Sequence, residues 1–170
     1  MKMNFRGKRA LWILVFFGVA FSFFGCAHVQ TNIMPNENFL DYKAAYIEIQ
    51  PKDEFNIASA ITYQLTDMGM EVLAKKVPDN PPKDSLLVKY TYEDGWDFTI
   101  YLKSFQIMFT NAASGKVIAN ISYHLTGIWV GSQTRIIDAF NDFRRKLGIK
   151  ELPGGSQDQA IEKASVPAQR

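Results

Sequence analysis

The feature that most constrains the fold is an alternating apolar pattern that begins near Ser85. Between residues 85 and 93, one set of side chains occupies every second position: Leu86, Val88, Tyr90 and Tyr92. The positions between them carry Leu87, Lys89, Thr91 and Glu93. A period of two is typical of a β-strand with one buried face. The pattern therefore predicts a strand that packs one of its faces on a core.

Two further strands are predicted after this one. Asp94-Gly95 is a hairpin signal, and residues 98–109 follow as the second strand. The apolar phase of that strand switches near Lys103-Ser104, which a bulge or a change of packing partner would explain. A second hairpin turn at residues 111–116, with Gly115 as its left-handed residue, leads to a strand at residues 117–125.

The first part of the domain predicts a βαβ unit. Residues 45–49 form a short strand, and Asp53 can cap the helix that follows. Apolar residues then recur at three- and four-residue spacing as far as Gly69, where a left-handed C-terminal residue belongs. Residues 70–73 form the next strand, which should run parallel to the first.

The last predicted element is a helix from about Thr134 to Gly148. Its apolar stripe consists of Ile136, Phe140, Phe143 and Leu147. The three basic residues 144–146 lie in its last turn, where solvated positions near the helix dipole are expected and an anionic-ligand site is the alternative.

The predicted order is β-α-β-β-β-β-α, an α+β fold in which both helices pack on one face of a mixed sheet. Four segments are expected: a signal peptide at 1–25, a lipidated cysteine with a polar tether at 26–41, a single domain at 42–148 and a flexible tail at 149–170. One domain of this length can bury a core of its own.

The N-terminal segment has the character of an export signal. Lys2, Arg6, Lys8 and Arg9 precede a nearly unbroken apolar run of 15 residues, Ala10–Phe24. A basic flank followed by a short apolar stretch is typical of a secretory signal peptide. The run is too short to cross a bilayer core of about 30 Å comfortably as a helix.

The end of the apolar run identifies the kind of signal. Phe23-Phe24-Gly25-Cys26 resembles a bacterial lipobox, although its phenylalanines are bulkier than that pattern prefers. The resemblance implies cleavage between Gly25 and Cys26 and a covalent lipid, such as palmitate, on Cys26. Ala27 is not the aspartate that commonly retains such proteins in the inner membrane, so an outer-membrane, periplasm-facing location is expected. An uncleaved anchor and a buried thiol are the alternatives.

Charge argues against a nucleic-acid partner. The 17 acidic residues all follow Cys26, whereas four of the 19 basic residues precede it, so the chain from Cys26 onward has a net charge of −2. Nucleic-acid binding relies on clustered basic side chains. Cys26 is the only cysteine, so the domain has no disulfide and its core must supply its stability.

Groups suited to catalysis are sparse. His28 and His124 are the only histidines, and neither lies at metal-ligand spacing. Glu93, Asp94 and Asp97 cluster around the predicted turn, where carboxylates accept backbone N–H bonds, and a cation site is the alternative. We expect no catalytic residues, no metal and no cofactor besides the lipid on Cys26.

Aromatic side chains are the one surplus of the predicted domain. Most of them are expected in the core, as is usual for strands. Trp96, Tyr101 and Trp129 are the candidates for an exposed apolar surface, and Trp129 lies between two glycines, Gly127 and Gly131, in a predicted contact loop.

Several segments together resemble an uncharacterised family of small proteobacterial lipoproteins. They are Leu87–Tyr92, Trp96-Asp97, Tyr101-Leu102, Ser114–Val117 and the helix that begins Thr134-Arg135-Ile136-Ile137, together with Gly25-Cys26. The family implies a lipoprotein without a known activity.

The sequence therefore predicts a membrane-anchored lipoprotein of the envelope that acts as a non-enzymatic interaction or assembly module. Its expected partners are the membrane, through the lipid, and another envelope protein. The alternative is a carrier of a small apolar or lipid ligand, which would need an enclosed apolar cavity between the sheet and the helices.

Overall fold

The computed structural model describes residues 27–73, 76–125 and 132–152. Its strands are β1 (Ala27–Ile33), β2 (Ala44–Glu48), β3 (Glu71–Leu73), β4 (Ser85–Asp97), β5 (Thr99–Asn111) and β6 (Val117–Leu125). Its helices are α2 (Ile57–Asp67) and α3 (Ser132–Lys146), with a short 3-10 helix, η1, at Phe39–Asp41. No helix within these ranges is long and apolar enough to cross a membrane.

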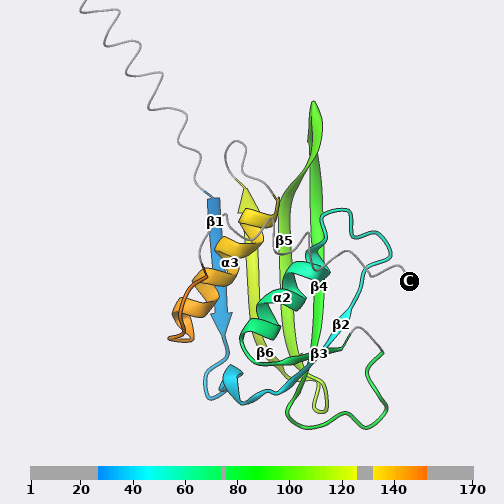
Figure 1. The fold of residues 1–170 in the computed structure, drawn as a ribbon, viewed down its shortest axis with the longest axis vertical. Coiled ribbons are helices and arrows are strands. Elements are labelled where there is room, and N and C mark those ends of the chain that lie inside the picture. Colours follow the sequence, from blue (N-terminus) through cyan, green and yellow to red (C-terminus); the bar gives the residue numbers. More distant parts are fainter. Residues whose placement is uncertain (1–26, 74–75, 126–131, 153–170) are drawn as a thin grey trace, which may run out of the picture.

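The strands form one mixed sheet in the order β1-β6-β5-β4-β2-β3. Strand β2 pairs in parallel with β3 and β4, and the other pairs are antiparallel. Both helices lie on the same face of the sheet (Figure 1). The α+β class and the order β-α-β-β-β-β-α are confirmed from β2 onward, and β1 is an additional strand before them.

The local signals of the βαβ unit are confirmed. The Asp53 carboxylate accepts the N–H groups of Ile57 and Ala58, each at 2.8 Å, and so satisfies free donors at the start of α2. Gly69 follows the helix with φ +87°, a left-handed conformation that glycine adopts without a Cβ clash. Strands β2 and β3 are parallel, as a βαβ crossover requires.

The polar tether expected at residues 26–41 is wrong for residues 27–33, which form β1. This strand pairs along its whole length with β6, from Ala27↔Leu125 to Ile33↔Ala119. Thr31 is buried, and Val29 and Ile33 pack against the core, so alternate residues of β1 face α3. The other positions carry exposed His28, Gln30 and Asn32, and this polar half of the alternation gave the segment the appearance of a spacer.

The first described residues after α3 also belong to the folded domain, although the tail was expected from residue 149. The Asn141 side chain donates to the carbonyl of Leu152 and accepts its N–H, both at 2.9 Å. The remainder of the expected tail, 153–170, lies outside the described residues.

The first hairpin turn lies three residues beyond its predicted place. Strand β4 continues through Asp94-Gly95 to Asp97, and the pairs Gly95↔Tyr101 and Asp97↔Thr99 place the turn at Phe98. The expected bulge is confirmed, because the register shifts between Glu93↔Ser104 and Asp94↔Leu102. Lys103 is thus the extra residue of β5.

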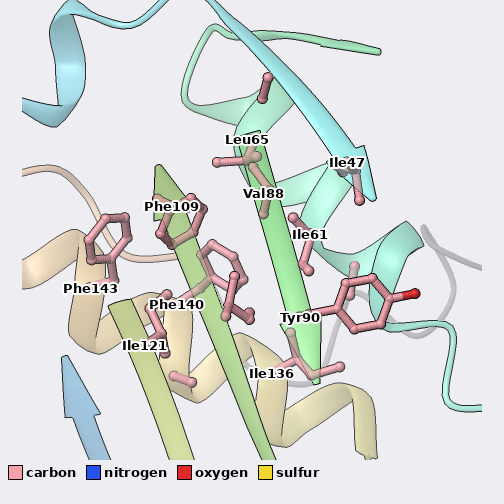
Figure 2. Close-up of a cluster of buried hydrophobic side chains, with 14 of the residues drawn as sticks. Ile47, Ile61, Leu65, Val88, Tyr90, Phe109, Ile121, Ile136, Phe140 and Phe143 are labelled. Carbon is pink, nitrogen blue, oxygen red and sulfur yellow. The ribbon is translucent and has the colours of Figure 1, made fainter. Parts of the chain in front are cut away.

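The core between the sheet and the helices is built around phenylalanine rings (Figure 2). Phe109 of β5 stacks on Phe143 of α3 with ring centroids 5.5 Å apart, and the Phe39 ring meets Phe109 edge-on at 5.0 Å. Phe140 approaches Phe109 and Phe143 edge-on from α3. All four residues are fully buried, so this cluster joins η1, the centre of the sheet and α3.

One of the three basic residues expected in solvent is buried. Arg144 is 3% exposed, and its guanidinium donates to Asp67 Oδ2 at 2.7 Å and to the side-chain and main-chain oxygens of Gln64 at 3.2 and 3.3 Å. A guanidinium offers five donors, so it can satisfy several acceptors at once. The solvated position expected for Arg144 is therefore wrong, and this side chain joins α3 to α2. Arg145 and Lys146 are exposed, as expected.

The buried hydroxyl of Tyr90 should make the free energy of unfolding fall at high pH. Burial raises the pKa of its hydroxyl to about 12, and this oxygen accepts the N–H of Gln50 at 3.1 Å. Because an unfolded tyrosine titrates near pH 10, burial of neutral Tyr90 contributes stability that is complete below that pH. We expect this contribution to be lost as pH rises from about 10 to about 12. Urea denaturation of the wild type and of Tyr90→Phe over this pH range measures the free energy of unfolding of each. Equal slopes of that free energy against pH for the two proteins would contradict the raised pKa of Tyr90.

Candidate functional site

A two-stranded arm projects from one end of the sheet (Figure 1). We define the arm as residues 94–103. Pairing of β4 with β2 ends at Glu48↔Lys89, and pairing of β5 with β6 begins at Ser104↔His124. Beyond these pairs, β4 and β5 bond only to each other. The arm therefore lacks a third strand on either side in the described part of the chain.

The tip of the arm exposes large apolar side chains. Phe98 is 91% exposed, Trp96 75% and Ile100 54%. Trp96 and Ile100 are cross-strand partners, and the Trp96 and Phe98 rings lie 6.2 Å apart between centroids. Among the described residues, only one other large apolar side chain, that of Ile49, is similarly exposed. Apolar residues gathered in this way mark a contact surface more often than residues scattered singly do.

The base of the arm is supported by α3. The Tyr101 ring lies against Gly95, where a Cβ atom would come within 2.5 Å of it. The guanidinium of Arg135 lies 5.9 Å from the centre of the Tyr101 ring and donates a hydrogen bond to the Leu102 carbonyl. Arg135 is only 2% exposed. Close packing at Gly95 and this buried cation therefore fix the direction of the arm relative to the helix.

These contacts explain the displaced hairpin turn. Asp94-Gly95 carries a local signal for a two-residue turn. The absence of a side chain at Gly95 instead leaves room for the Tyr101 ring, so the glycine lies inside β4. Phe98 then occupies the turn with φ +59°, a left-handed conformation that costs about 1–2 kcal/mol for a residue with a Cβ.

The predicted surface residues have different positions. Trp96 is on the exposed tip, whereas Tyr101 is half-buried at the base, against Gly95 and near Arg135. Trp129 and the cleavage and lipidation residues, Gly25 and Cys26, lie outside the described residues. Sequence reasoning missed Phe98 and Ile100 as surface residues. No local signal indicates them: the extra residue Lys103 keeps Ile100 in the same alternation as the buried Leu102, and Phe98 and Ile100 are exposed because the arm extends beyond the neighbouring strands.

We expect Phe98→Asn to raise the free energy of unfolding by about 0.5–1 kcal/mol, because asparagine adopts left-handed backbone conformations more readily than phenylalanine. Urea denaturation measures the difference, provided that the free energy of unfolding depends on urea concentration with the same slope in both proteins. Phe98→Val is the matched control, and a β-branched residue at this φ should lower stability. Loss of stability in Phe98→Asn would show instead that the phenyl ring stabilises the folded arm.

The sheet face opposite the helices is mainly polar. Asn32, Asn120, Met108 and Lys89 form one row across it, and Gln30, Ser122, Gln106 and Thr91 form the next. Lys89 also pairs with Glu48 of β2 at 2.9 Å, with both side chains about half exposed. Such a pair contributes little to stability.

The groups considered for catalysis are spread along one edge of that polar face. His28 and His124 are cross-strand partners, and both are exposed. The Glu93 carboxylate accepts the Ser104 hydroxyl at 3.2 Å and lies 3.9 Å from the Lys103 ammonium. Glu93 and Asp94 flank the bulge instead of a turn, and Asp97 is next to Phe98. Within the described residues, no group of three or more histidine, cysteine or acidic side chains could hold a metal ion.

Comparisons with known proteins find similarity in structure only. No protein-family model matches the chain, and no curated protein matches its sequence. A DUF4136 family protein from Bacteroides thetaiotaomicron is 15% identical, with 74% of this chain and 98% of that chain covered and a TM-score of 0.49. PelC from Paraburkholderia phytofirmans, solved as a dodecamer, is 14% identical over 74% of this chain and 99% of its own, with a TM-score of 0.46.

The lipoprotein character of this chain stays a prediction.

Proposed function

We propose that this protein is a non-enzymatic interaction module of the bacterial envelope, anchored by a lipid on Cys26, that makes its contacts through the arm. The observation that carries the proposal is the exposure of Trp96, Phe98 and Ile100 at the end of a supported hairpin. Exposing apolar surface to water is unfavourable, and a partner that covers these side chains removes that cost. Another envelope protein is the partner expected from the sequence.

The filled core favours an interaction module over a carrier. A carrier would need space for its ligand between the sheet and the helices. The rings of Phe39, Phe109, Phe140 and Phe143 occupy that layer in mutual contact, and each is fully buried. Packing of this kind supports a role for the outer surface of the domain.

The position of Cys26 supports a close anchor. Cys26 immediately precedes Ala27, the first residue of β1. Because β1 is part of the sheet, a lipid on Cys26 would hold the domain directly at the membrane. Ala27 stands where an aspartate would commonly retain such a protein in the inner membrane. It therefore supports a location at the outer membrane, with the domain facing the periplasm.

Crosslinking in intact cells tests the proposal. Tagged wild-type protein, the arm double variant Trp96→Ser/Phe98→Ser and the control Ile49→Ser are crosslinked, purified and analysed by mass spectrometry. Ile49 is 53% exposed and outside the arm, so it matches the change in polarity at another site. We expect a defined envelope component with the wild type and with Ile49→Ser, and its loss with the arm variant.

The anchor is tested in the same cells. Cys26→Ser should lose metabolic labelling by a fatty-acid analogue, which the wild type should incorporate. Equal recovery of all components by the wild type and the arm variant would reject the arm as the contact surface. Absence of label in the wild type would reject the lipid anchor.

A further inference from the structure

The arm points away from the same end of the sheet at which β1 begins. His28 of β1, His124 of β6, Ser104 of β5 and Glu93 of β4 form one row across the sheet. Strand β1 begins one residue before this row, at Ala27, which pairs with Leu125, and the arm extends past the row. Figure 1 shows the start of β1 and the tip of the arm at the same end of the molecule.

We propose that the tip of the arm inserts into the surface of the lipid bilayer that holds the anchor, as a second point of attachment. The inference rests on the proposed lipid on Cys26, and it gives the arm the bilayer as its partner in place of the envelope protein expected from the sequence. Phe98 is five residues beyond Glu93, so the tip lies about 15 Å past the row at the rise of a β-strand. Cys26 is two residues beyond His28, so a bilayer that holds its lipid is within reach of the tip.

The composition of the tip fits the interfacial layer of a membrane. Trp96 has an amphipathic ring of the type enriched at membrane–water interfaces, and Phe98 and Ile100 add apolar area beside it. Asp94 in the same segment opposes deep insertion, since a charge in the hydrocarbon core is costly. Shallow insertion into a neutral surface, driven by apolar contact and insensitive to salt, follows from this combination.

The anchor makes a small insertion effective. Several acyl chains on Cys26 would give stable attachment on their own, so the tip adds a fixed orientation and not the attachment itself. A lipid on Cys26 keeps the tip at high local concentration near the bilayer, so the second contact forms within one complex. Packing of Tyr101 on Gly95 and of Arg135 over Tyr101 holds the arm in its direction. Two attachment points would fix the orientation of the domain on the membrane.

Tryptophan fluorescence tests the inference. The processed lipoprotein with Trp129→Phe keeps Trp96 as its single tryptophan, because Trp12 is removed with the signal peptide. It is reconstituted in phosphatidylcholine vesicles with ordinary or brominated acyl chains, which quench tryptophan on contact. We expect brominated lipid to reduce Trp96 emission by about half, with a shift to shorter wavelength and no dependence on salt.

Matched variants separate the arm from the anchor. Phe98→Ser/Ile100→Ser should reduce the quenching severalfold, whereas Ile49→Ser should leave it unchanged. Thermal melting of each variant checks that the domain remains folded, which we expect because these side chains are exposed.

Two outcomes would count against a proposal, and each identifies which one. Equal Trp96 emission in the two vesicle types, with the protein still floating with the vesicles, would overturn insertion of the arm. If an envelope protein is crosslinked in cells through an intact arm in that case, the arm binds protein and the proposed function stands. Failure of the processed protein to float with vesicles would overturn the anchor itself.

Discussion

Phe109→Ala is expected to lower the free energy of unfolding by about 4 kcal/mol, the cost typical of replacing a buried phenylalanine by alanine. The Phe109 ring contacts Phe39 edge-on at 5.0 Å and stacks on Phe143 at 5.5 Å between centroids. Its removal leaves a cavity among rings from η1 and α3 that cannot collapse without moving both elements. Urea denaturation at equilibrium measures the loss.

Two controls make this result specific. Ile49→Ala removes an apolar side chain that is 53% exposed and should change stability by less than about 0.5 kcal/mol. Phe109→Leu keeps most of the volume and should retain most of the stability. A loss below about 1 kcal/mol for Phe109→Ala would contradict a close-packed core and would favour the carrier alternative.

Arg144→Ala is expected to lower the free energy of unfolding by about 3 kcal/mol, because several buried acceptors lose their donor together. The guanidinium donates to the side chain and carbonyl of Gln64, to the carbonyl of Lys150 at 3.1 Å and to Asp67. Asp67 is 39% exposed, so water can replace the guanidinium at its carboxylate. The main cost therefore comes from the buried oxygens of Gln64.

The adjacent residue is a matched control. Arg145 is exposed and pairs with Asp142 and Glu151, so Arg145→Ala should leave stability nearly unchanged. Arg144→Lys keeps the charge but has one ammonium group in place of the planar fork, and it should recover only part of the loss. Similar stabilities for Arg144→Ala and Arg145→Ala would contradict the buried position of Arg144.

Local patterns predicted most of the framework because they depend on neighbouring residues. The alternation at Val88 and Tyr90 identified the buried face of β4, and both residues are buried. The phase switch located the bulge at Lys103. Gly69 and Gly148 end their helices with positive φ, as glycine at these positions predicts.

The missed features depend on partners that are distant in sequence. Strand β1 forms because β6, some 90 residues later, offers its edge and α3 covers Thr31. Arg144 is buried by Asp67 and Gln64 of α2, 77 and 80 residues earlier. A local pattern contains none of this information.

The arm was missed for a different reason. The turn signal at Asp94-Gly95 is a local preference, and the packing of Tyr101 on Gly95 overrides it. Trp96 was identified as a surface candidate from the surplus of aromatic residues in the domain. The exposure of Phe98 and Ile100, in contrast, depends on how far the hairpin extends beyond the neighbouring strands.

Photo-crosslinking from position 98 in intact cells tests directly whether the arm is the contact surface of this protein. A photoreactive phenylalanine analogue replaces Phe98, and the same analogue at Thr91, an exposed position on the polar sheet face, is the control. We predict a specific adduct from position 98, of lipid mass if the arm inserts into the bilayer, and no such adduct from position 91. Equal, unspecific labelling from both positions would contradict the claim that the arm is the contact surface of this protein.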